Sequence, residues 1–239
     1  MTPRLHYFER VDSTMDVIHE MAAGGAESGT AVLAGEQLGG RGSRGRQWHS
    51  PPGGLWLSLL FRPSALGGIE IISLRVGLAV AGAIEPRLAG PVLIKWPNDL
   101  MLGDRKVGGI LCEARWQGSA LGWIAVGIGL NVSNVIPSDL GGTAVALAEE
   151  QPGMTREDVV EPILAAARQV DLAADHLTPG ELERFNSRDW LLGREIRTPV
   201  AGTAAGLRND GALLVRTPDG AEIPLRSGSI ELAAVSHTR

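Results

Sequence analysis

Gly39-Gly40-Arg41-Gly42-Ser43-Arg44-Gly45-Arg46-Gln47-Trp48-His49 constrains the fold and chemistry of this chain more than any other segment. Three arginines are interspersed with glycines, and a tryptophan follows them. Glycine lets the backbone turn sharply and approach a ligand closely, and arginine provides a charged fork that matches carboxylate and phosphate oxygens. Residues 37–69 contain no Asp or Glu. We therefore predict that residues 39–49, the arginine loop, bind a small anion; a solvated surface loop is the alternative.

The composition is that of an ordinary soluble globular protein. Hydrophobic residues make up 44% of the 239 residues, enough for one large domain or one domain with a small appendage. The net charge of -5 argues against non-specific nucleic-acid binding. Cys112 is the single cysteine, so an internal disulfide is impossible and a reducing cytoplasm fits. The sequence shows neither an apolar signal-peptide core nor an uninterrupted membrane span.

Hydrophobic periodicity predicts strands and helices along residues 1–132. Ser13 and its neighbours can cap a helix that ends near Ala23. Residues 70–88 are apolar almost all round, which predicts a buried helix. The expected strands, rich in apolar and β-branched residues, are 5–8, 30–34, 55–61, 92–95, 100–102, 106–115 and 123–132.

Residues 155–190 change to a helical composition. Thr155 and Asp158 resemble a capping box, and Pro162 predicts a kink or a late helix start. A second helix is expected from Thr178-Pro179 to about Leu192-Gly193.

The C-terminal segment is predicted to be a small β-barrel. Turn sequences separate five short strand candidates, namely 195–200, 203–207, 212–217, 221–225 and 230–233. The change in pattern predicts a catalytic domain over residues 1–191 and a second domain over residues 192–239.

Three further segments place polar or charged side chains at or next to predicted strands. Lys95-Trp96-Pro97-Asn98-Asp99 places a cation, an amide and a carboxylate in a turn, where the oxygens either hold Mg²⁺ or satisfy the turn itself. Lys106 starts an apolar strand with two glycines and either reaches inward or is an exposed hairpin lysine. Asn131 in strand 127–132 either binds a metal or phosphate or bonds only to backbone.

Together and in this order, the arginine loop, Lys95–Asp99, Asp104–Leu111 and Gly127–Val132 closely resemble the biotin protein ligase family. The resemblance covers nearly the whole chain. It implies an α/β (α+β) fold, in which a mixed central sheet with packed helices forms a catalytic domain related to class II tRNA synthetases, followed by an SH3-like domain. Bifunctional members carry an N-terminal helix-turn-helix domain; here the Ser-Thr pair already stands at Ser13, so the resemblance implies the monofunctional form.

The family implies a cytoplasmic enzyme that uses ATP and Mg²⁺ to convert biotin to biotinyl-5′-AMP. The biotinyl group then passes to a lysine of the biotin carboxyl carrier domain of acetyl-CoA carboxylase or a related carboxylase. By resemblance, the catalytic residues are Lys106 and Arg41. The implied biotin-binding residues are Ser13, Thr14, Met15, Gln37, Gly40, Arg41, Gly42, Ser43, Lys106 and Gly109. The implied ATP or adenylate residues are Arg41, Arg44, Arg46, Trp48, Lys106 and Asn131. The implied metal-binding residues are Asn98, Asp99 and Asn131.

Two positions depart from the family pattern. Many members have Asn where Met15 stands, and some have a loop arginine where Ser43 stands; that arginine helps retain the adenylate, so we expect weaker retention here. Loop closure over the ligands is also expected. The alternatives are a lipoate or octanoate ligase or transferase of the same superfamily and a non-catalytic biotin sensor. Neither membrane nor nucleic-acid partners are expected; a homodimer is possible, and the sequence does not give the oligomeric state.

Overall fold

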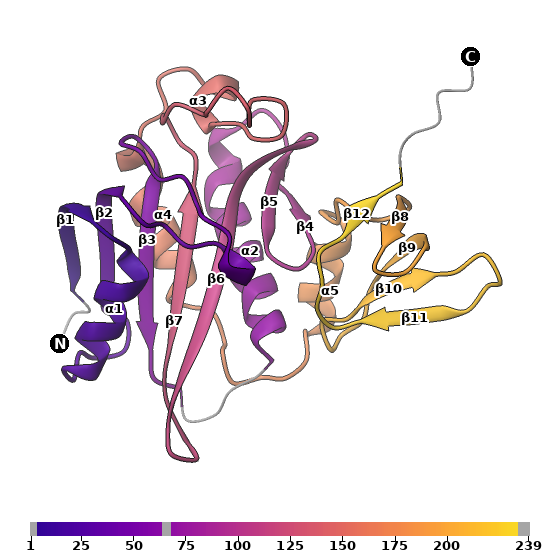
Figure 1. Ribbon diagram of the computed structural model, residues 1–239, viewed down its shortest axis with the longest axis horizontal. Coiled ribbons are helices and arrows are strands. Elements are labelled where there is room, and N and C mark those ends of the chain that lie inside the picture. Colours follow the sequence, from indigo (N-terminus) through magenta and orange to yellow (C-terminus); the bar gives the residue numbers. More distant parts are fainter. Residues whose placement is uncertain (1–3, 64–67, 234–239) are drawn as a thin grey trace.

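The computed structural model describes residues 4–63 and 68–233, which form a large mixed sheet, a smaller sheet and helices packed on the larger one (Figure 1). The large sheet has seven strands in the order β1-β2-β3-β7-β6-β5-β4. Its strands are β1 (Leu5–Val11), β2 (Ala31–Gln37), β3 (Leu55–Phe61), β4 (Leu93–Lys95), β5 (Asp99–Leu102), β6 (Arg105–Gln117) and β7 (Ala120–Leu130). β1 and β2 are parallel, and the other neighbours are antiparallel.

Alternation along the central strands divides the interior into two layers. In β3, Leu55, Leu57 and Leu59 face the larger core, whereas Leu60 faces the smaller one. β7 repeats this arrangement: its even-numbered apolar residues face the larger core, and its other face carries Gly127 and Gly129. The second face therefore has room for a ligand.

Helices cover both faces of the sheet (Figure 1). The helices are α1 (Thr14–Ala23), α2 (Ile69–Ile84), α3 (Leu147–Glu150), α4 (Arg156–Ala167) and α5 (Pro179–Asn186), with single 3₁₀ turns η1 (Ser43–Gly45) and η2 (Glu85–Arg87). α1 packs on β2, β3 and β7, while α2 packs on β4, β5 and β6 and also contacts α4 and α5. As predicted, the Ser13 side chain caps α1 by accepting a hydrogen bond from the Met15 amide.

The helical segments differ from the predictions at three ends. The predicted late start at Pro162 is wrong, because α4 begins at Arg156, where Asp158 completes a capping box and the buried apolar face continues past the proline. α5 ends at Asn186 rather than near residue 192, because the chain then turns to pair Asp189 with β4. The helix expected over 70–88 gives way to η2 after Ile84.

The C-terminal strands form a separate antiparallel sheet in the order β11-β10-β9-β8-β12. They are β8 (Glu195–Thr198), β9 (Gly202–Leu207), β10 (Leu213–Arg216), β11 (Glu222–Leu225) and β12 (Glu231–Leu232). Their inward side chains, including Ile196 and Leu213, join the larger core. The buried Trp96 also donates its Nε1 hydrogen to the Gly211 carbonyl at 2.9 Å, which joins the two sheets.

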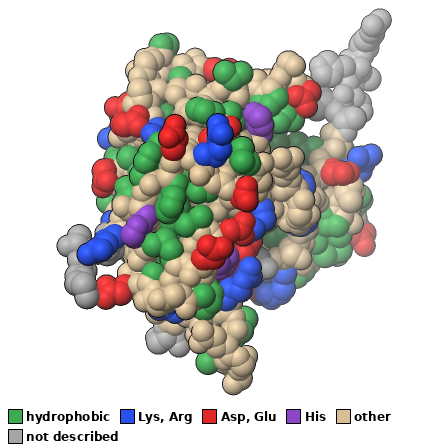
Figure 2. Space-filling model, turned by 60° about the vertical axis from the view of Figure 1, so that its left-hand side comes forward, with side chains coloured by type: hydrophobic (Ala, Val, Ile, Leu, Met, Phe, Trp, Pro, Cys, Tyr) green, Lys and Arg blue, Asp and Glu red, His purple; other side chains and the backbone are tan. Residues whose placement is uncertain are grey.

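The surface combines charges of both signs with apolar side chains on the face shown in Figure 2. No helix within the described ranges combines the length and the apolar character that a membrane span requires. Cys112 is half-buried rather than fully enclosed, and its Sγ lies 3.4 Å from Ser73 Oγ.

Asp189 is a partly buried carboxyl group at the connection between the sheets. Its Oδ1 accepts a hydrogen bond from the Leu191 amide at 2.9 Å, whereas the buried Oδ2 has no hydrogen-bond partner in the described part of the chain. Burial raises the pKa of Asp189 from 3.8 to about 6. Between these two pKa values Asp189 binds its proton more tightly in the folded protein than in the unfolded chain. The free energy of unfolding therefore falls as the pH rises from about 4 to about 6.

We predict that Asp189→Asn removes this pH dependence. In the unmodified protein the free energy of unfolding should fall by about 2 kcal/mol between pH 4 and pH 7 through Asp189 alone. Urea unfolding of both proteins at each pH measures the difference. An equal pH slope in both proteins would show that Asp189 has the same pKa in the folded and unfolded states.

Candidate active site

A pocket of about 540 Å³ opens on the α1 side of the large sheet. The start of α1 and the arginine loop lie along it, strands β5, β6 and β7 form its base, and residues 136–144 border it. Segments distant in sequence thus meet over the face of the sheet that carries the glycines.

The base of the pocket is made of glycines on adjacent strands, here called the glycine floor: Gly109 of β6 with Gly127 and Gly129 of β7. A Cβ atom at Gly129 would lie 2.8 Å from Trp48 Nε1, and one at Gly127 would lie 2.9 Å from Met15 Sδ. These distances are shorter than van der Waals contact, so the floor admits Trp48 and Met15 only because it has no side chains.

One end of the pocket is polar and uncharged. Ser58 Oγ donates to Thr14 Oγ1 at 2.8 Å, and Thr14 donates through both its backbone N and its Oγ1 to Gln37 Oε1, at 2.8 and 3.0 Å. Gln37 Nε2 then donates to Ser50 Oγ at 2.8 Å. This chain of hydrogen bonds fixes the orientation of each group, with Ser13 buried beside it.

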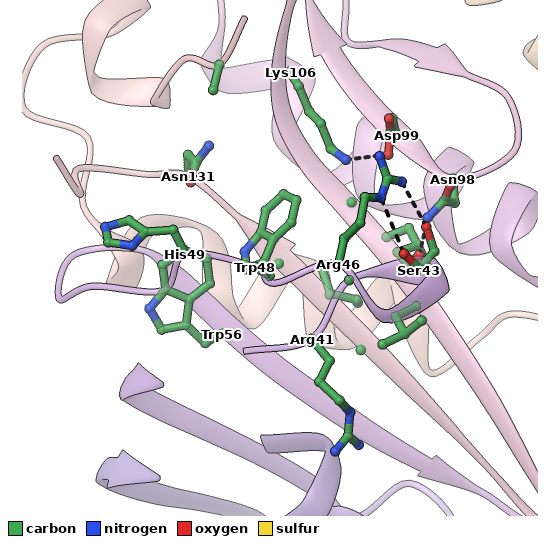
Figure 3. Close-up of a pocket in the computed structure, with 18 of the residues that line it drawn as sticks. Arg41, Ser43, Arg46, Trp48, His49, Trp56, Asn98, Asp99, Lys106 and Asn131 are labelled. Carbon is green, nitrogen blue, oxygen red and sulfur yellow. Dashed lines mark hydrogen bonds and ion pairs between the residues drawn. The ribbon is translucent and has the colours of Figure 1, made fainter. Parts of the chain in front are cut away.

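The other end of the pocket is charged. Lys106 Nζ lies 2.5 Å from Asp99 Oδ1 and 4.9 Å from the centre of the Trp48 ring. The Asp99 oxygen is buried and accepts no well-aligned hydrogen bond, so the ion pair compensates its charge. Arg46 donates to Ser43 within the loop, and Figure 3 shows it beside Lys106 and Asp99.

Lys95 also lies at this end, with its Nζ 5.1 Å from the centre of the Trp190 ring. Burial lowers the pKa of Lys95 below its ordinary value, Asp99 opposes the change, and Lys106 and Arg46 add to it. Lys95 and Lys106 are the only two lysines of the whole sequence, and both line the pocket. Cationic side chains that converge on one point favour an anionic ligand.

The arginine loop forms a small hairpin over the pocket. The amide of Gly42 donates to the Arg46 carbonyl at 2.7 Å, and the amide of Trp48 donates to the Gly40 carbonyl at 2.8 Å. A Cβ atom at Gly40 would lie 2.4 Å from the Trp48 carbonyl oxygen, so this position requires glycine to close the hairpin. Trp48 Nε1 is buried against Gly129 and has no hydrogen-bond partner among the described residues.

Two loop residues that we predicted to contact ligand lie outside the pocket, and a third lines it with its side chain turned aside. Gly40 lies outside the pocket, enclosed by Trp48 and Ser50. Arg44 has a left-handed backbone with φ of 61° and donates to Ser229 Oγ beyond the large sheet. Arg41 borders the pocket, but its guanidinium is directed away from Lys106 (Figure 3).

The chain matches the model of the biotin/lipoate A/B protein ligase family over residues 7–131. It is 33% identical to the biotin–[acetyl-CoA-carboxylase] ligase of Paracoccus denitrificans, over 90% of this chain and 95% of that protein. It is also 32% identical to the bifunctional ligase/repressor BirA of Bacillus subtilis, over 97% of this chain and 75% of the relative.

The chain belongs to the biotin/lipoate A/B protein ligase family. Its fold agrees with that of a solved family member, the biotin protein ligase of Aquifex aeolicus in complex with biotin and ATP. That structure matches with a TM-score of 0.81 and 28% sequence identity, over 98% of this chain and 99% of the other. The predicted mixed sheet with packed helices and the additional C-terminal β-sheet are therefore confirmed.

Most residues that the ligase resemblance singled out lie together. Within residues 4–63 and 68–233, these predicted residues line one pocket: Ser13, Thr14, Met15, Gln37, Arg41, Gly42, Ser43, Arg46, Trp48, Asn98, Asp99, Lys106, Gly109 and Asn131. Met15 lines it as an apolar side chain whose sulfur lies over Gly127. Gly40 and Arg44 support the loop from outside.

The side-chain oxygens at the charged end would suit one Mg²⁺ ion. No three His, Cys, Asp or Glu side chains form a metal-binding group in the described ranges. Asp99 and Asp104 are the carboxylates that line the pocket, and Asp104 pairs with Arg194. Asn98 donates its Nδ2 hydrogen to the Ile110 carbonyl and keeps its side-chain oxygen for another partner, whereas Asn131 Oδ1 accepts from Asn134. Mg²⁺ in nucleotide sites typically takes one or two carboxylates plus phosphates.

Sequence reasoning missed part of the pocket wall. Lys95 was recognised as a cation in its turn but not as a site residue, although its motif provided the signal. Trp190 and Leu140 line the same pocket from segments that carried no ligase motif. Their positions depend on how the connections after β7 and α5 return to the sheet, which local sequence does not specify.

We predict that Thr14→Val destabilises the protein by about 1–3 kcal/mol, because a buried hydrogen-bonding group loses its partner. Ser58 Oγ would then have no acceptor at position 14. Urea unfolding measures the loss, and Thr198→Val, which removes an exposed hydroxyl bonded to Glu231, is the matched control. Equal costs for the two variants would show that the Thr14 hydrogen bonds contribute little.

Proposed function

We propose that this chain is a biotin–protein ligase that activates biotin with ATP and transfers it to a carrier lysine. The observation that carries the proposal is the polarity of the pocket. A fixed, uncharged hydrogen-bonding end at Thr14 and Gln37 and a cationic end at Lys106 lie on either side of the glycine floor. Biotin has the matching chemistry, since its flat ureido ring forms hydrogen bonds and its carboxylate stands at the end of an apolar chain.

The polar end supports recognition of the ureido ring. Ser13 and Thr14 are buried, and the Gln37 amide is held at both its oxygen and its nitrogen. A site built on fixed hydrogen-bonding groups rejects analogues that lack the matching groups, because its own buried groups are then left unpaired. Lipoate carries no ureido ring, so this end disfavours the lipoate branch of the family.

The cationic end supports the adenylation step. A biotin carboxylate oxygen forms a bond to the α-phosphorus of ATP, and the bond from that phosphorus to the pyrophosphate oxygen breaks. Lys106 can neutralise the carboxylate and the α-phosphate as they meet, and Arg46 and Lys95 lie beside it for the other phosphate oxygens. Preorganised charges of this kind are a main source of catalysis in phosphoryl chemistry.

Mg²⁺ at Asp99, with Asn98 and Asn131 beside it, would neutralise phosphate charge when bound. Because Asp99 is paired with Lys106 in the ligand-free protein, Lys106 has to leave Asp99 for the carboxylate and phosphates. Trp48 is the residue that we assign to the adenine ring.

The second step transfers the biotinyl group to a lysine amine, which forms an amide bond as the bond to AMP breaks. We assign the acceptor to the biotin carboxyl carrier domain of an acyl-CoA carboxylase, as the name of the Paracoccus relative suggests.

Three expectations from the sequence stay predictions. They are the domain limits 1–191 and 192–239, the cytoplasmic location and the absence of nucleic-acid binding. A homodimer is compatible with the proposal and is not required by it.

Pyrophosphate exchange tests the proposal without a carrier. Incorporation of labelled pyrophosphate into ATP should require biotin and Mg²⁺. Exchange with lipoate or octanoate but not biotin would place the protein in the other branch of the family. Biotin binding without any exchange would favour the non-catalytic biotin sensor.

We predict that Lys106→Ala lowers the exchange rate roughly 10²- to 10³-fold, as loss of one preorganised charge does in other enzymes. Arg105→Ala is the matched control, because the adjacent Arg105 pairs with Glu149 on the outside and should keep its rate. A Lys106→Ala protein that retains more than about a tenth of the rate would remove Lys106 from the central role.

A further inference from the structure

Arg194 lies next to the charged end of the pocket, where it contacts two lining residues, Asp104 and Trp190. We propose that Arg194, together with Lys95, binds the β- and γ-phosphates of ATP and holds the pyrophosphate that leaves, and that Asp104 occupies Arg194 until the nucleotide arrives. The identity of the leaving group rests on the proposed function. The assignment of a polyphosphate to Arg194 rests on the geometry of the charged end alone.

The Trp190 ring supports both cations. Trp190 is buried, and its indole nitrogen donates to the Gly103 carbonyl at 2.9 Å, so the ring has a fixed position in the pocket wall. The guanidinium carbon of Arg194 lies 3.8 Å from the ring centre, and Lys95 Nζ lies 5.1 Å from it. Cations are attracted to the face of an aromatic ring. One tryptophan therefore places two cations at one wall of the pocket.

The backbone of Arg194 is also fixed. Its amide donates to the Leu191 carbonyl, and its carbonyl accepts from the Ala204 amide, both at 2.9 Å. The residue stands directly before β8, at the connection between the large and the small sheet. A change of partner by Arg194 therefore requires movement of the side chain and not of the backbone.

The charges at this end of the pocket are not balanced without an anion. Four cations gather there, namely Arg46, Lys95, Lys106 and Arg194. The described residues offer two carboxylates in the pocket lining, Asp99 paired with Lys106 and Asp104 paired with Arg194. Burial lowers the pKa of Lys95 below its ordinary value, and repulsion from Arg194 adds to the effect. A polyphosphate supplies the negative charge that would relieve this repulsion.

Asp104 is a partner that Arg194 can leave easily. The guanidinium donates to Asp104 Oδ1 at 2.7 Å, but the Asp104 side chain is 76% exposed, and exposed ion pairs contribute little. A guanidinium bonds two phosphate oxygens at once, which favours phosphate over this carboxylate. Asp99 begins β5 and Asp104 follows its end, so one hairpin holds both carboxylates that the substrates replace.

The chemistry of the two steps separates Arg194 from Lys106. In adenylation a biotin carboxylate oxygen bonds to the α-phosphorus, and the electron pair of the breaking bond goes to the pyrophosphate oxygen. Negative charge therefore builds on the leaving group, where Arg194 and Lys95 stabilise it. In the transfer step AMP leaves and pyrophosphate takes no part. Arg194 should matter to the first step alone, whereas Lys106 faces the α-phosphate in both.

The test compares Arg194→Gln, Asp104→Asn and the double variant with the unmodified protein. Arg197→Gln is the matched control, because the nearby Arg197 lies on β8 and pairs with Glu231. Calorimetric titration with ATP and with AMP, both with Mg²⁺, reports the phosphate subsite whatever acid the protein activates. The KM for ATP in pyrophosphate exchange reports the first step. Transfer from preformed biotinyl-5′-AMP to a biotin carboxyl carrier domain reports the second.

We expect Arg194→Gln to weaken ATP binding and to raise the KM for ATP about tenfold, because charge-assisted hydrogen bonds to phosphate are lost. AMP binding and the transfer step should stay within about twofold, because neither involves the β- and γ-phosphates. Asp104→Asn should tighten ATP binding about threefold, and this gain should vanish when Arg194 is also changed. Arg194→Lys keeps the charge and should lose less than Arg194→Gln. Thermal unfolding checks that each variant is folded.

Unchanged ATP affinity in folded Arg194→Gln, or an equal loss of affinity for ATP and AMP, would overturn the phosphate assignment. Slower transfer from preformed biotinyl-5′-AMP would overturn the restriction to the leaving group. A gain in Asp104→Asn that persists in the double variant would show general repulsion of phosphate and overturn the role of Asp104. Absence of biotin-dependent exchange in the unmodified protein counts against the ligase function, while the ATP and AMP titrations still decide whether Arg194 binds polyphosphate.

Discussion

The absence of side-chain atoms on one face of β6 and β7 is the constraint on which the site depends. Gly127 and Gly129 let Met15 and Trp48 approach the sheet at distances shorter than a Cβ atom would allow, and Gly109 continues the same face. The opposite face of the same strands carries Ile110, Ile128 and other large apolar residues of the main core. One sheet thus provides a packed core on one side and a ligand surface on the other, and strand alternation accounts for both.

The arginines of the loop divide into two roles that composition alone does not distinguish. Arg46 lies beside Lys106 and Asp99 at the charged end of the pocket. Arg41 and Arg44 contact Asp16 and Ser229, which belong to α1 and to the C-terminal part of the chain. These two arginines therefore connect the loop to two other parts of the chain.

The sequence predicted most of the elements, and most of the residues it singled out line one pocket, because both depend on local patterns. Runs of apolar and β-branched residues identified β3 and β7, the Ser13 cap identified α1, and the motif residues Lys106 and Asp99 lie in contact. Side-chain direction was not predictable in the same way. Whether Arg41 turns toward phosphate or toward Glu113 depends on a residue 72 positions later in the chain, at a register that only the folded sheet provides.

Helix ends and pocket walls escaped prediction for a related reason. The apolar face of α4 and its capping box compensate for the hydrogen bond lost at Pro162. Trp190 enters the pocket because the turn after α5 pairs with β4 and donates the Trp190 indole hydrogen to the Gly103 carbonyl. These are tertiary interactions, and they override local propensity.

A crystal structure with biotin and a non-hydrolysable ATP analogue tests the central claim most directly. The account predicts the biotin ring over the glycine floor, its ureido group at Ser13, Thr14 and Gln37, and its carboxylate at Lys106, which has left Asp99. Biotin in the reverse orientation, with its carboxylate at Thr14, or biotin bound outside this pocket would contradict the account.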